Sequence, residues 1–281
     1  MDPKRIATET LTAFENGSYT SSEGVNIELL SLLRECLEST RHFQPEELSA
    51  LESPTLQRPS PGAPTTFAVT PETSLQGAAR LTASKIYQRV AVLNFASARK
   101  PGGGFLSGAQ AQEESLARSS GLYLSLLRCQ EFYDFHRSLD ACLYSDRMIY
   151  SPHCPVVRDD AGLWLPAPYL VDFITSAAPN AGAIMRNEPH NRARIGPTLR
   201  ERVGKVLALA AHYQVDALVL GAWGCGVFQN DPQVVASAFY EWLSPGGAFE
   251  NRFSHVLFAI RDSSHDHPVY NAFANTLATL L

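Results

Sequence analysis

Short apolar runs recur along the chain after residue 66, and more polar segments separate them. The runs cover residues 67–69, 90–95, 148–150, 169–175, 216–223 and 256–260. Because they are apolar on consecutive positions, they suit strands that helices cover on both faces. Apolar side chains at helical spacing mark residues 116–127, 199–210, 234–242 and the stretch after residue 270. Strands alternating with helices predict a three-layer α/β domain with a mixed, mostly parallel sheet.

The first part of the chain follows another pattern. Apolar residues at helical spacing predict one helix near residues 6–14 and a second, buried helix near residues 27–37. The stretch 53–66 holds four prolines, so it cannot be the interior of a helix or a central strand. We therefore expect a small helical N-terminal region at 1–52, a proline-rich connection at 53–66 and the main domain at 67–281.

Charge and cysteine content narrow the function classes. A formal net charge of −5 argues against duplex DNA or RNA held on a basic surface, but backbone N–H groups can still bind a small anion. The five cysteines form no CxxC pair, which favours free thiols in a reducing compartment. No apolar run approaches the ~20 residues that span a bilayer, and the first residues lack the apolar core of a signal peptide. We expect a cytoplasmic protein with no membrane partner.

In sheets of this kind, ligands bind outside the carboxyl ends of the strands. Small or amide residues follow three of the expected strands at that end. They are Asn94 with the glycines after it, the segment from Ser176 to Asn180, and the segment from Gly224 to Phe228. We expect these three segments to converge on one crevice.

Three consecutive glycines stand seven residues before a Gln-Glu-Glu triplet at 112–114. The glycines at 102–104 let a backbone approach a ligand closely, because no Cβ intervenes. Acidic residues are common in the first turn of a helix, where the helix dipole favours them, so either feature alone is most often structural. Together they indicate acid/base chemistry on a ligand that the loop holds.

The segment FASARKPGGGFLSGAQAQEESLARSSGLY, residues 95–123, resembles the bacterial-type poly(ADP-ribose) glycohydrolases. The similarity continues through ITSAAPNAG and LVLGAWGCGVFQNDP, residues 174–182 and 218–232. It implies a macrodomain fold with a small helical N-terminal extension, and a glycosidase that releases ADP-ribose from poly(ADP-ribose). It also implies ADP-ribosylated proteins as substrates, reversal of ADP-ribosylation in the DNA damage response, a monomer, and no metal or other cofactor.

The resemblance further implies roles for residues around the glycine loop. Glu114 would be the catalytic acid and base, and Glu113 would hold hydroxyls of the distal ribose. Asn94 would bind the same ribose. The loop of Gly102, Gly103 and Gly104 would admit this ribose and the neighbouring phosphate.

The second glycine-rich segment would bind the diphosphate. The residues that the resemblance implies for this loop are Gly224, Cys225, Gly226, Val227 and Phe228, and Phe228 would also orient the distal ribose. Taken alone, the segment suits an ordinary strand-to-helix turn equally well, since Pro232 stands at a good helix start. Gln112 and Ser176 are further ligand-binding candidates. Ser97 stands where other members carry asparagine, so we expect no equivalent contact from it.

The chemistry of the bond supports a single acid. The leaving alkoxide needs a proton, and the ribosyl carbon can carry positive charge as an oxocarbenium ion. One carboxylic acid can donate that proton and then, as a carboxylate, take one from the attacking water. A helix N-terminus favours the ionised form of Glu114, whereas burial and the charge of Glu113 favour the protonated form. We expect the two acids to titrate as a coupled pair.

Alternatives remain at three places. Residues 185–205 carry six basic side chains, which suit a solvated surface or a contact with further units of a polyanionic chain: Arg186, Arg192, Arg194, Arg200, Arg202 and Lys205. His265 and His267 lack a third ligand, so no metal site is expected.

The glycohydrolase has two alternatives: a macrodomain that binds ADP-ribose without cleaving it, and a hydrolase of another ADP-ribosyl linkage. The paired acids argue against binding alone.

Overall fold

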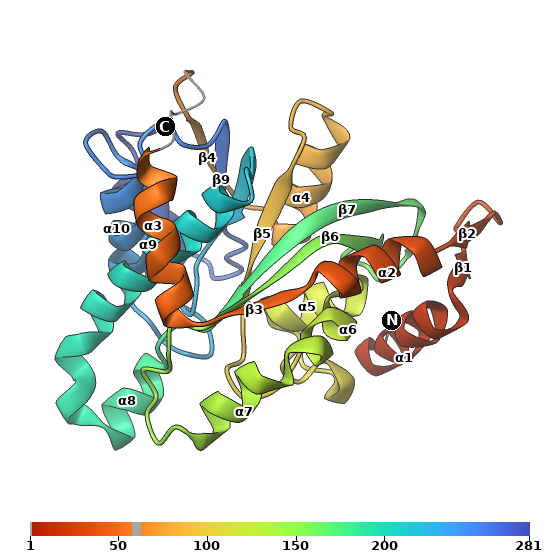
Figure 1. Ribbon diagram of the computed structural model, residues 1–281, viewed down its shortest axis with the longest axis horizontal. Helices are drawn as coiled ribbons and strands as arrows, with labels where there is room; N and C mark the ends of the chain where they lie inside the picture. Colours follow the sequence, from red (N-terminus) through yellow and green to blue (C-terminus); the bar gives the residue numbers. More distant parts are fainter. Residues whose placement is uncertain (1, 58–62) are drawn as a thin grey trace.

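The computed structural model describes residues 2–57 and 63–281, and it has three layers (Figure 1). Within these residues a seven-stranded sheet forms the middle layer, in the order β3-β6-β7-β5-β8-β9-β4. The strands are β3 (Arg41–Phe43), β4 (Thr66–Thr70), β5 (Val90–Phe95), β6 (Met148–Arg158), β7 (Trp164–Ser176), β8 (Ala217–Leu220) and β9 (His255–Ala259). The pairs from β7 to β4 are parallel, and the two pairs that include β6 are antiparallel. The predicted three-layer domain with a mixed, mostly parallel sheet is confirmed.

The predicted apolar runs coincide with strands, but their lengths differ. Strand β5 matches its run of residues 90–95. Strands β6 and β7 extend well beyond their runs, because they form a long antiparallel ribbon that reaches the pair Arg158 and Trp164. Strand β8 is shorter than its run and ends at Leu220, because the chain turns directly afterwards.

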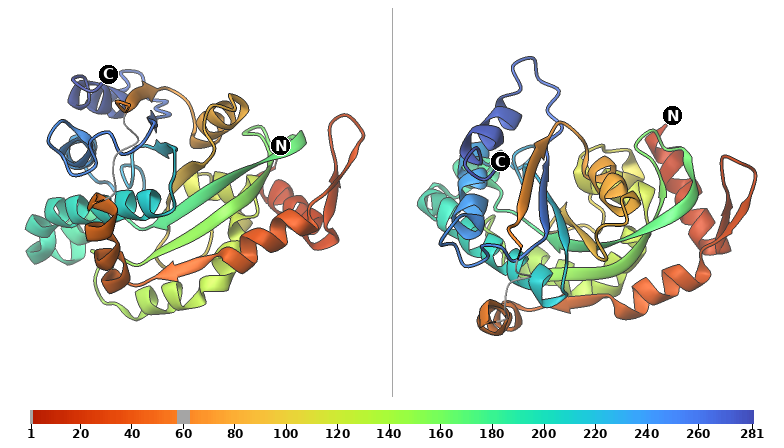
Figure 2. Two further views of the ribbon diagram at one scale, coloured as in Figure 1. Left: turned by 45° about the horizontal axis from the view of Figure 1, so that its top comes forward. Right: turned by 90° about the horizontal axis from the view of Figure 1, so that it is seen from above.

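One face of the sheet is covered by α3 (Pro45–Gln57), α9 (Ile195–His212), α10 (Pro232–Leu243) and α11 (Pro268–Thr276), as Figure 2 shows. Helices α9 and α10 contain the segments predicted to be helical, and α11 covers the predicted stretch after residue 270 only as far as Thr276. The large side chains Trp223, Phe239 and Phe258 are buried between this layer and the sheet. Burial of each such side chain stabilises the fold by about 2 kcal/mol.

The other face carries α2 (Leu30–Ser39), α4 (Ser74–Ala83), α5 (Gln112–Ser119), α6 (Leu122–Leu126), the short 3₁₀ helix η2 (Leu127–Cys129) and α7 (Gln130–Ser138). The helix predicted across 116–127 is therefore interrupted. Ser120 adopts an extended conformation and forms a bridge with Val156 of β6, and the Gly121 N–H donates to the Pro155 carbonyl. This contact with the sheet ends α5 and starts α6 in a new direction.

The N-terminal region is not purely helical, which corrects the expectation for residues 1–52. After α1 (Pro3–Asn16), the hairpin of β1 (Ser18–Thr20) and β2 (Asn26–Glu28), and α2, the chain enters the central sheet as β3. Strand β3 pairs with β6 through only three residues, too few to give a recognisable apolar pattern.

The predicted proline-rich connection is also shorter than 53–66. Helix α3 continues to Gln57, and β4 starts at Thr66, so both ends of that range belong to regular structure. The rest of the range, residues 58–62, lies outside the described residues.

Helix α1 lies against the part of the molecule that carries the glycine-rich segment. It contacts α5 and the 3₁₀ helix η1 (Phe105–Ser107), and its Ala7 and Leu11 pack with Phe105, Ala117 and Tyr123. None of the helices described is both long enough and apolar enough to cross a membrane.

Candidate active site

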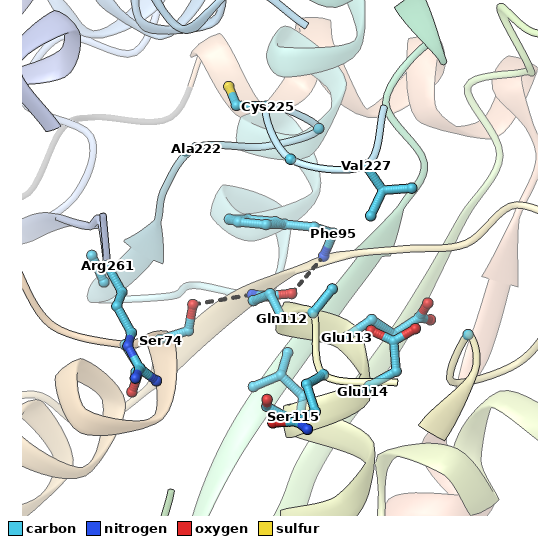
Figure 3. A pocket seen from close by; sticks show the side chains of 18 of the residues that line it. Ser74, Phe95, Gln112, Glu113, Glu114, Ser115, Ala222, Cys225, Val227 and Arg261 are labelled. Carbon is cyan, nitrogen blue, oxygen red and sulfur yellow. Dashed lines mark hydrogen bonds between the residues drawn. The ribbon is translucent and has the colours of Figure 1, made fainter. Parts of the chain in front are cut away.

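A cavity of about 750 Å³ lies at the carboxyl ends of β5, β8 and β9, beside the first turns of α4 and α5 (Figure 3). Its wall includes residues 72–75, 95–97, 103–104, 110–116, 222, 224–228 and 259–263. Glu113 and Glu114 lie at one end, Ser74 and Arg261 lie at the other, and the loop with Cys225 and Val227 passes over the space between them (Figure 3). The predicted convergence is thus confirmed for the ends of β5 and β8. At the third position β9 replaces β7.

The three glycines form a turn that brings the backbone against Glu114. Gly102 and Gly103 have φ values of 64° and 60°, and the Gly103 N–H donates to the Lys100 carbonyl at 3.0 Å. Gly103 and Gly104 line the cavity, but Gly102 does not. A Cβ at Gly102 would lie 3.0 Å from the ring of Phe105, so this glycine faces the protein interior. A Cβ at Gly103 would lie 2.2 Å from Glu114 Oε1 and 3.1 Å from Glu113 Oε2. The absent side chain therefore makes room for the protein's own carboxylates.

The two glutamates are held differently. Glu113 is 3% exposed, and both of its oxygens accept hydrogen bonds: Oε2 from the Ser97 N–H at 2.7 Å and Oε1 from Asn94 Nδ2 at 3.3 Å. Glu114 accepts from the Gly104 N–H at 2.9 Å through Oε1, whereas Oε2 has no partner among the described residues. Both side chains border the cavity. Glu113 is held at both oxygens, and Glu114 is held at one, with its second oxygen buried and unpaired.

Burial raises the pKa of Glu113 to about 8, and the charge of Glu114 adds to this rise. Hydrogen bonds from Ser97, Asn94 and Gly102 act in the opposite direction, because they favour the carboxylate. Burial therefore favours the protonated form of Glu113 near neutral pH.

The raised pKa of Glu113 predicts a stability that falls with pH. The unfolded chain loses this proton near pH 4.5 and the folded chain near pH 8. Between these values the folded state binds a proton that the unfolded state lacks, so the free energy of unfolding falls by up to about 1.4 kcal/mol per pH unit. Glu113→Gln should remove this fall, and Glu15→Gln on the exposed face of α1 should not. Urea denaturation at about pH 5 and about pH 8 tests this, and parallel pH dependences for wild type and E113Q would contradict it.

Asn94 does not line the cavity, which corrects its predicted contact with ribose. Its side chain is fully buried, and Nδ2 donates to Glu113 Oε1 and, at 3.1 Å, to Thr175 Oγ1. Successive side chains of a strand alternate between faces, and Asn94 points to the face that α5 covers. It therefore holds Glu113 in place through this hydrogen bond. Ser97 also supports Glu113, through its backbone N–H.

Gln112 and Ser176 were predicted to bind ligand. The amide of Gln112 is instead hydrogen-bonded within the protein, and Ser176 is buried away from the cavity. Gln112 borders the cavity, but its amide accepts from the Phe95 N–H and donates to Ser74 Oγ and the Leu93 carbonyl. Both of its N–H bonds are thus used to anchor α5 on β5 and α4. Ser176 is fully buried away from the cavity, and its carbonyl accepts from Trp223 Nε1 at 3.0 Å.

The loop after β8 presents backbone donors to the cavity. Gly224 has a φ of 73°, and a Cβ there would lie 2.5 Å from Asn230 Nδ2, which in turn donates to the carbonyls of Gly224 and Pro179. The N–H groups of Gly226 and the next two residues, 227–228, donate to no acceptor within the described chain. This loop can therefore hold an anion without any basic side chain.

The two larger side chains of this loop and its thiol differ in their surroundings. Phe228 packs near Tyr144, with ring centroids 6.0 Å apart, and Val227 is 78% exposed. Burial raises the pKa of Cys225 to about 12, so its thiol is not a nucleophile at neutral pH. In the described part of the chain, no three His, Cys, Asp or Glu side chains are grouped as a metal site would need.

Several residues of the cavity wall were not predicted from the sequence. They are Glu72, Thr73, Ser74, Lys100, Arg118, Asp160, Arg261, Asp262 and Val269. The position of Arg261 and Asp262 could have been found, because they follow the apolar run of β9 as the glycine segments follow β5 and β8. No feature of the sequence marked Arg118, because it resembles any other charged residue of a helix.

Comparisons with known proteins agree with this site. The family model for the catalytic domain of microbial-type PARG matches residues 7–159. A crystal structure of poly(ADP-ribose) glycohydrolase from Thermomonospora curvata is 49% identical, covers 98% of each chain and has a TM-score of 0.94. The structure from that organism with the inhibitor ADP-HPD is 48% identical, covers 97% of this chain and 98% of that chain, and has a TM-score of 0.90.

A more distant relative has been solved with ADP-ribose. The poly(ADP-ribose) glycohydrolase of Deinococcus radiodurans is 45% identical, covers 88% of this chain and 97% of its own, and has a TM-score of 0.83. The comparison with curated proteins gave no match. A family model over more than half of the chain, and close relatives over nearly all of it, agree with the three glycines and paired glutamates at the cavity. The chain belongs to the microbial-type poly(ADP-ribose) glycohydrolases.

Proposed function

We propose that the chain releases ADP-ribose by cleaving the ribose–ribose O-glycosidic bonds of poly(ADP-ribose), with Glu114 as both acid and base. The position of Glu114 carries this proposal. One of its oxygens accepts from the Gly104 N–H, the other is buried without a partner among the described residues, and the residue lines the cavity. A carboxyl group held in this way can exchange a proton with a ligand that enters the cavity.

The reaction needs one proton given to the leaving oxygen and one proton taken from the attacking water. Glu114 donates its proton to the bridging oxygen while the bond from that oxygen to the anomeric carbon breaks. The ribosyl carbon develops oxocarbenium character, which the nearby substrate diphosphate stabilises. Water then attacks this carbon, and its proton passes to the Glu114 carboxylate, which restores the acid.

We place the distal ribose between the glutamates and Phe228. Glu113 borders the cavity with a carboxyl whose pKa is raised to about 8, so near neutral pH it can donate a hydrogen bond to a ribose hydroxyl. The diphosphate would lie on the N–H groups of residues 226–228. The adenosine would occupy the end with Phe95, Ile260 and Val269, where apolar side chains border the cavity.

Incubation of the protein with poly(ADP-ribose), followed by chromatography of the products, tests the reaction. We expect free ADP-ribose to accumulate. Binding of ADP-ribose without its release from polymer would indicate a binding macrodomain. Cleavage of terminal ester or nucleic-acid adducts in preference to polymer, in a panel of linkages, would indicate the other hydrolase. A crystal soaked with ADP-ribose should show it between residues 102–104 and 224–228.

Five of the six basic side chains that follow β7 fall into two groups. Arg200, Arg202 and Lys205 form ion pairs with acidic side chains of the protein. Arg192 and Arg194 lie on the exposed 3₁₀ helix η3 (Pro189–Arg194), after α8 (Ala181–Asn187). We propose that these two contact further units of the polymer, where cations would add electrostatic attraction.

The double variant R192E/R194E should then weaken binding of long polymer by about tenfold, which corresponds to about 1.4 kcal/mol. Binding of ADP-ribose should change much less. The double variant R34E/R128E, at exposed positions of α2 and η2, controls for net charge. Fluorescence anisotropy with labelled polymer and with ADP-ribose measures both affinities. Equal losses for the two ligands would dismiss the contact.

We further propose that the protein acts as a monomer on ADP-ribosylated proteins in the cytoplasm, and that it reverses modification during the response to DNA damage. Its cysteines support a reducing compartment, because all five are free thiols. Pull-down of ADP-ribosylated proteins with an inactive variant after DNA damage would test this setting.

A further inference from the structure

Arg118 is a buried cation in the wall of the cavity, and the reaction described above gives it no role. Its side chain lies on α5, one helical turn after Glu114, and the residue is 8% exposed. The contacts of its guanidinium are with neutral oxygens: Nη1 donates to the Ala109 carbonyl, and Nη2 donates to Ser115 Oγ at 3.3 Å. Burying an arginine with neutral partners is costly, so its position calls for an explanation.

The Ala109 carbonyl belongs to a chain of hydrogen bonds that leads to the catalytic carboxyl. The Ala109 N–H donates to the Gly104 carbonyl at 3.2 Å, and the Gly104 N–H donates to Glu114 Oε1 at 2.9 Å. The chain therefore starts at Arg118 and returns to Glu114 on the same helix, and it closes the turn 104–109 against α5. The backbone of Arg118 is also held, since its carbonyl accepts from Thr10 Oγ1 of α1 at 2.8 Å.

We propose that Arg118 is a positioning residue for cleavage of the glycosidic bond. It fixes the 104–109 turn, so that the Gly104 N–H holds one oxygen of Glu114 and leaves the other unpaired. Its positive charge also favours the carboxylate form that takes the proton from water. This inference rests on the role of Glu114 proposed above.

Among the described residues of the cavity wall, Arg118 is the buried cation. Glu113 adjoins Glu114 on α5, and Tyr133 of α7 interacts electrostatically with Glu113. Lys4 of α1 reaches the turn, with its Cγ 3.2 Å from the Cβ position of Gly108, but it is exposed. The remaining charged groups of the cavity wall are Glu72, Lys100, Asp160, Arg261 and Asp262. Arg118 and Glu114 interact electrostatically, and four residues separate them on one helix.

Two substitutions separate the mechanical contribution from the electrostatic one. Arg118→Gln removes the charge, and it should lower kcat about 10- to 100-fold by misplacing the turn, with little change in KM or in ADP-ribose binding. It should also move the alkaline limb of the pH profile of kcat to higher pH, because Glu114 must be protonated to act as the acid and loss of a positive neighbour raises the pKa of a carboxyl group. Arg118→Lys should lower kcat less and keep the wild-type pH profile. Arg200→Gln, at the exposed pair with Glu241, should change neither.

Rates of ADP-ribose release from polymer across pH, calorimetric binding of ADP-ribose and thermal melting provide the readouts. A folded R118Q protein with wild-type kcat and pH profile would overturn the proposal. So would equal losses in R118Q and R118K with an unmoved profile, since these would assign a role in folding alone. If R118Q does not fold, R118K decides: a reduced kcat with wild-type melting and ADP-ribose binding supports the proposal, and a wild-type kcat overturns it. A wild-type protein that releases no ADP-ribose would instead reject the proposed function.

Discussion

Glu114→Gln is expected to reduce the release of ADP-ribose from polymer by about 10²- to 10⁴-fold, because a general acid and base contributes that much. Glutamine has the shape of glutamate and can still accept the Gly104 N–H that now bonds Oε1. It cannot donate a proton to the leaving oxygen or take one from water. ADP-ribose should therefore bind to the variant about as tightly as to wild type. Single-turnover rates with polymer, together with calorimetry with ADP-ribose, measure the two effects separately.

Glu15→Gln is the matched control, since it makes the same chemical change on the exposed face of α1. It should retain wild-type turnover. Near-normal turnover of E114Q would show that Glu114 is not the acid and base, whatever its position beside the glycine turn. Loss of both turnover and ADP-ribose binding would point to a disturbed cavity, so the assignment needs the binding measurement as much as the rate.

Much of the fold could be predicted because its strands are buried on both faces. Continuous apolar runs at 90–95 and 256–260 are nearly coextensive with β5 and β9. Strand β3 could not be predicted in this way, because three residues at the edge of a sheet carry too little pattern. Its place depends on pairing with β6, which is far away in the sequence.

The candidate site could be predicted as a set of segments, but not as a set of contacts. Sequence reasoning placed Asn94 and Glu113 at the same ligand, whereas the structure places Asn94 beneath Glu113. A polar residue near the end of a strand can face the ligand or the covering helix, and the register with the helix decides between them. The same limit applies to Gln112, whose amide anchors α5 to β5 and α4.

Gly103 was correctly predicted as a position of close approach, but the group that approaches it in the structure is Glu114. Consecutive glycines predict close approach to a ligand, and the structure adds an approach to Glu114 within the protein itself. This distance depends on how the turn packs against α5, which the spacing of glycines and glutamates in the sequence does not specify. It makes Gly103 a strong test of the site.

Gly103→Ala should reduce turnover at least about 10²-fold, because displacement of a catalytic group by about 1 Å has effects of this size. The new Cβ would lie 2.2 Å from Glu114 Oε1, so the carboxyl or the turn must move. A second cost comes from the backbone, since φ is 60° at this position and alanine in the left-handed region costs about 1–2 kcal/mol. The variant should therefore lose both activity and stability, and turnover with polymer and urea denaturation measure the two losses.

Gly246→Ala separates the two causes. Gly246 has a φ of 82°, and a Cβ there would meet nothing within 4 Å, so this variant carries the backbone cost without the clash. We expect it to lose about 1–2 kcal/mol of stability and to keep its turnover. If G103A behaves like G246A and remains active, the 2.2 Å approach does not constrain Glu114. If only G103A is inactive while both are similarly destabilised, the missing side chain of Gly103 is what allows Glu114 to reach its working position.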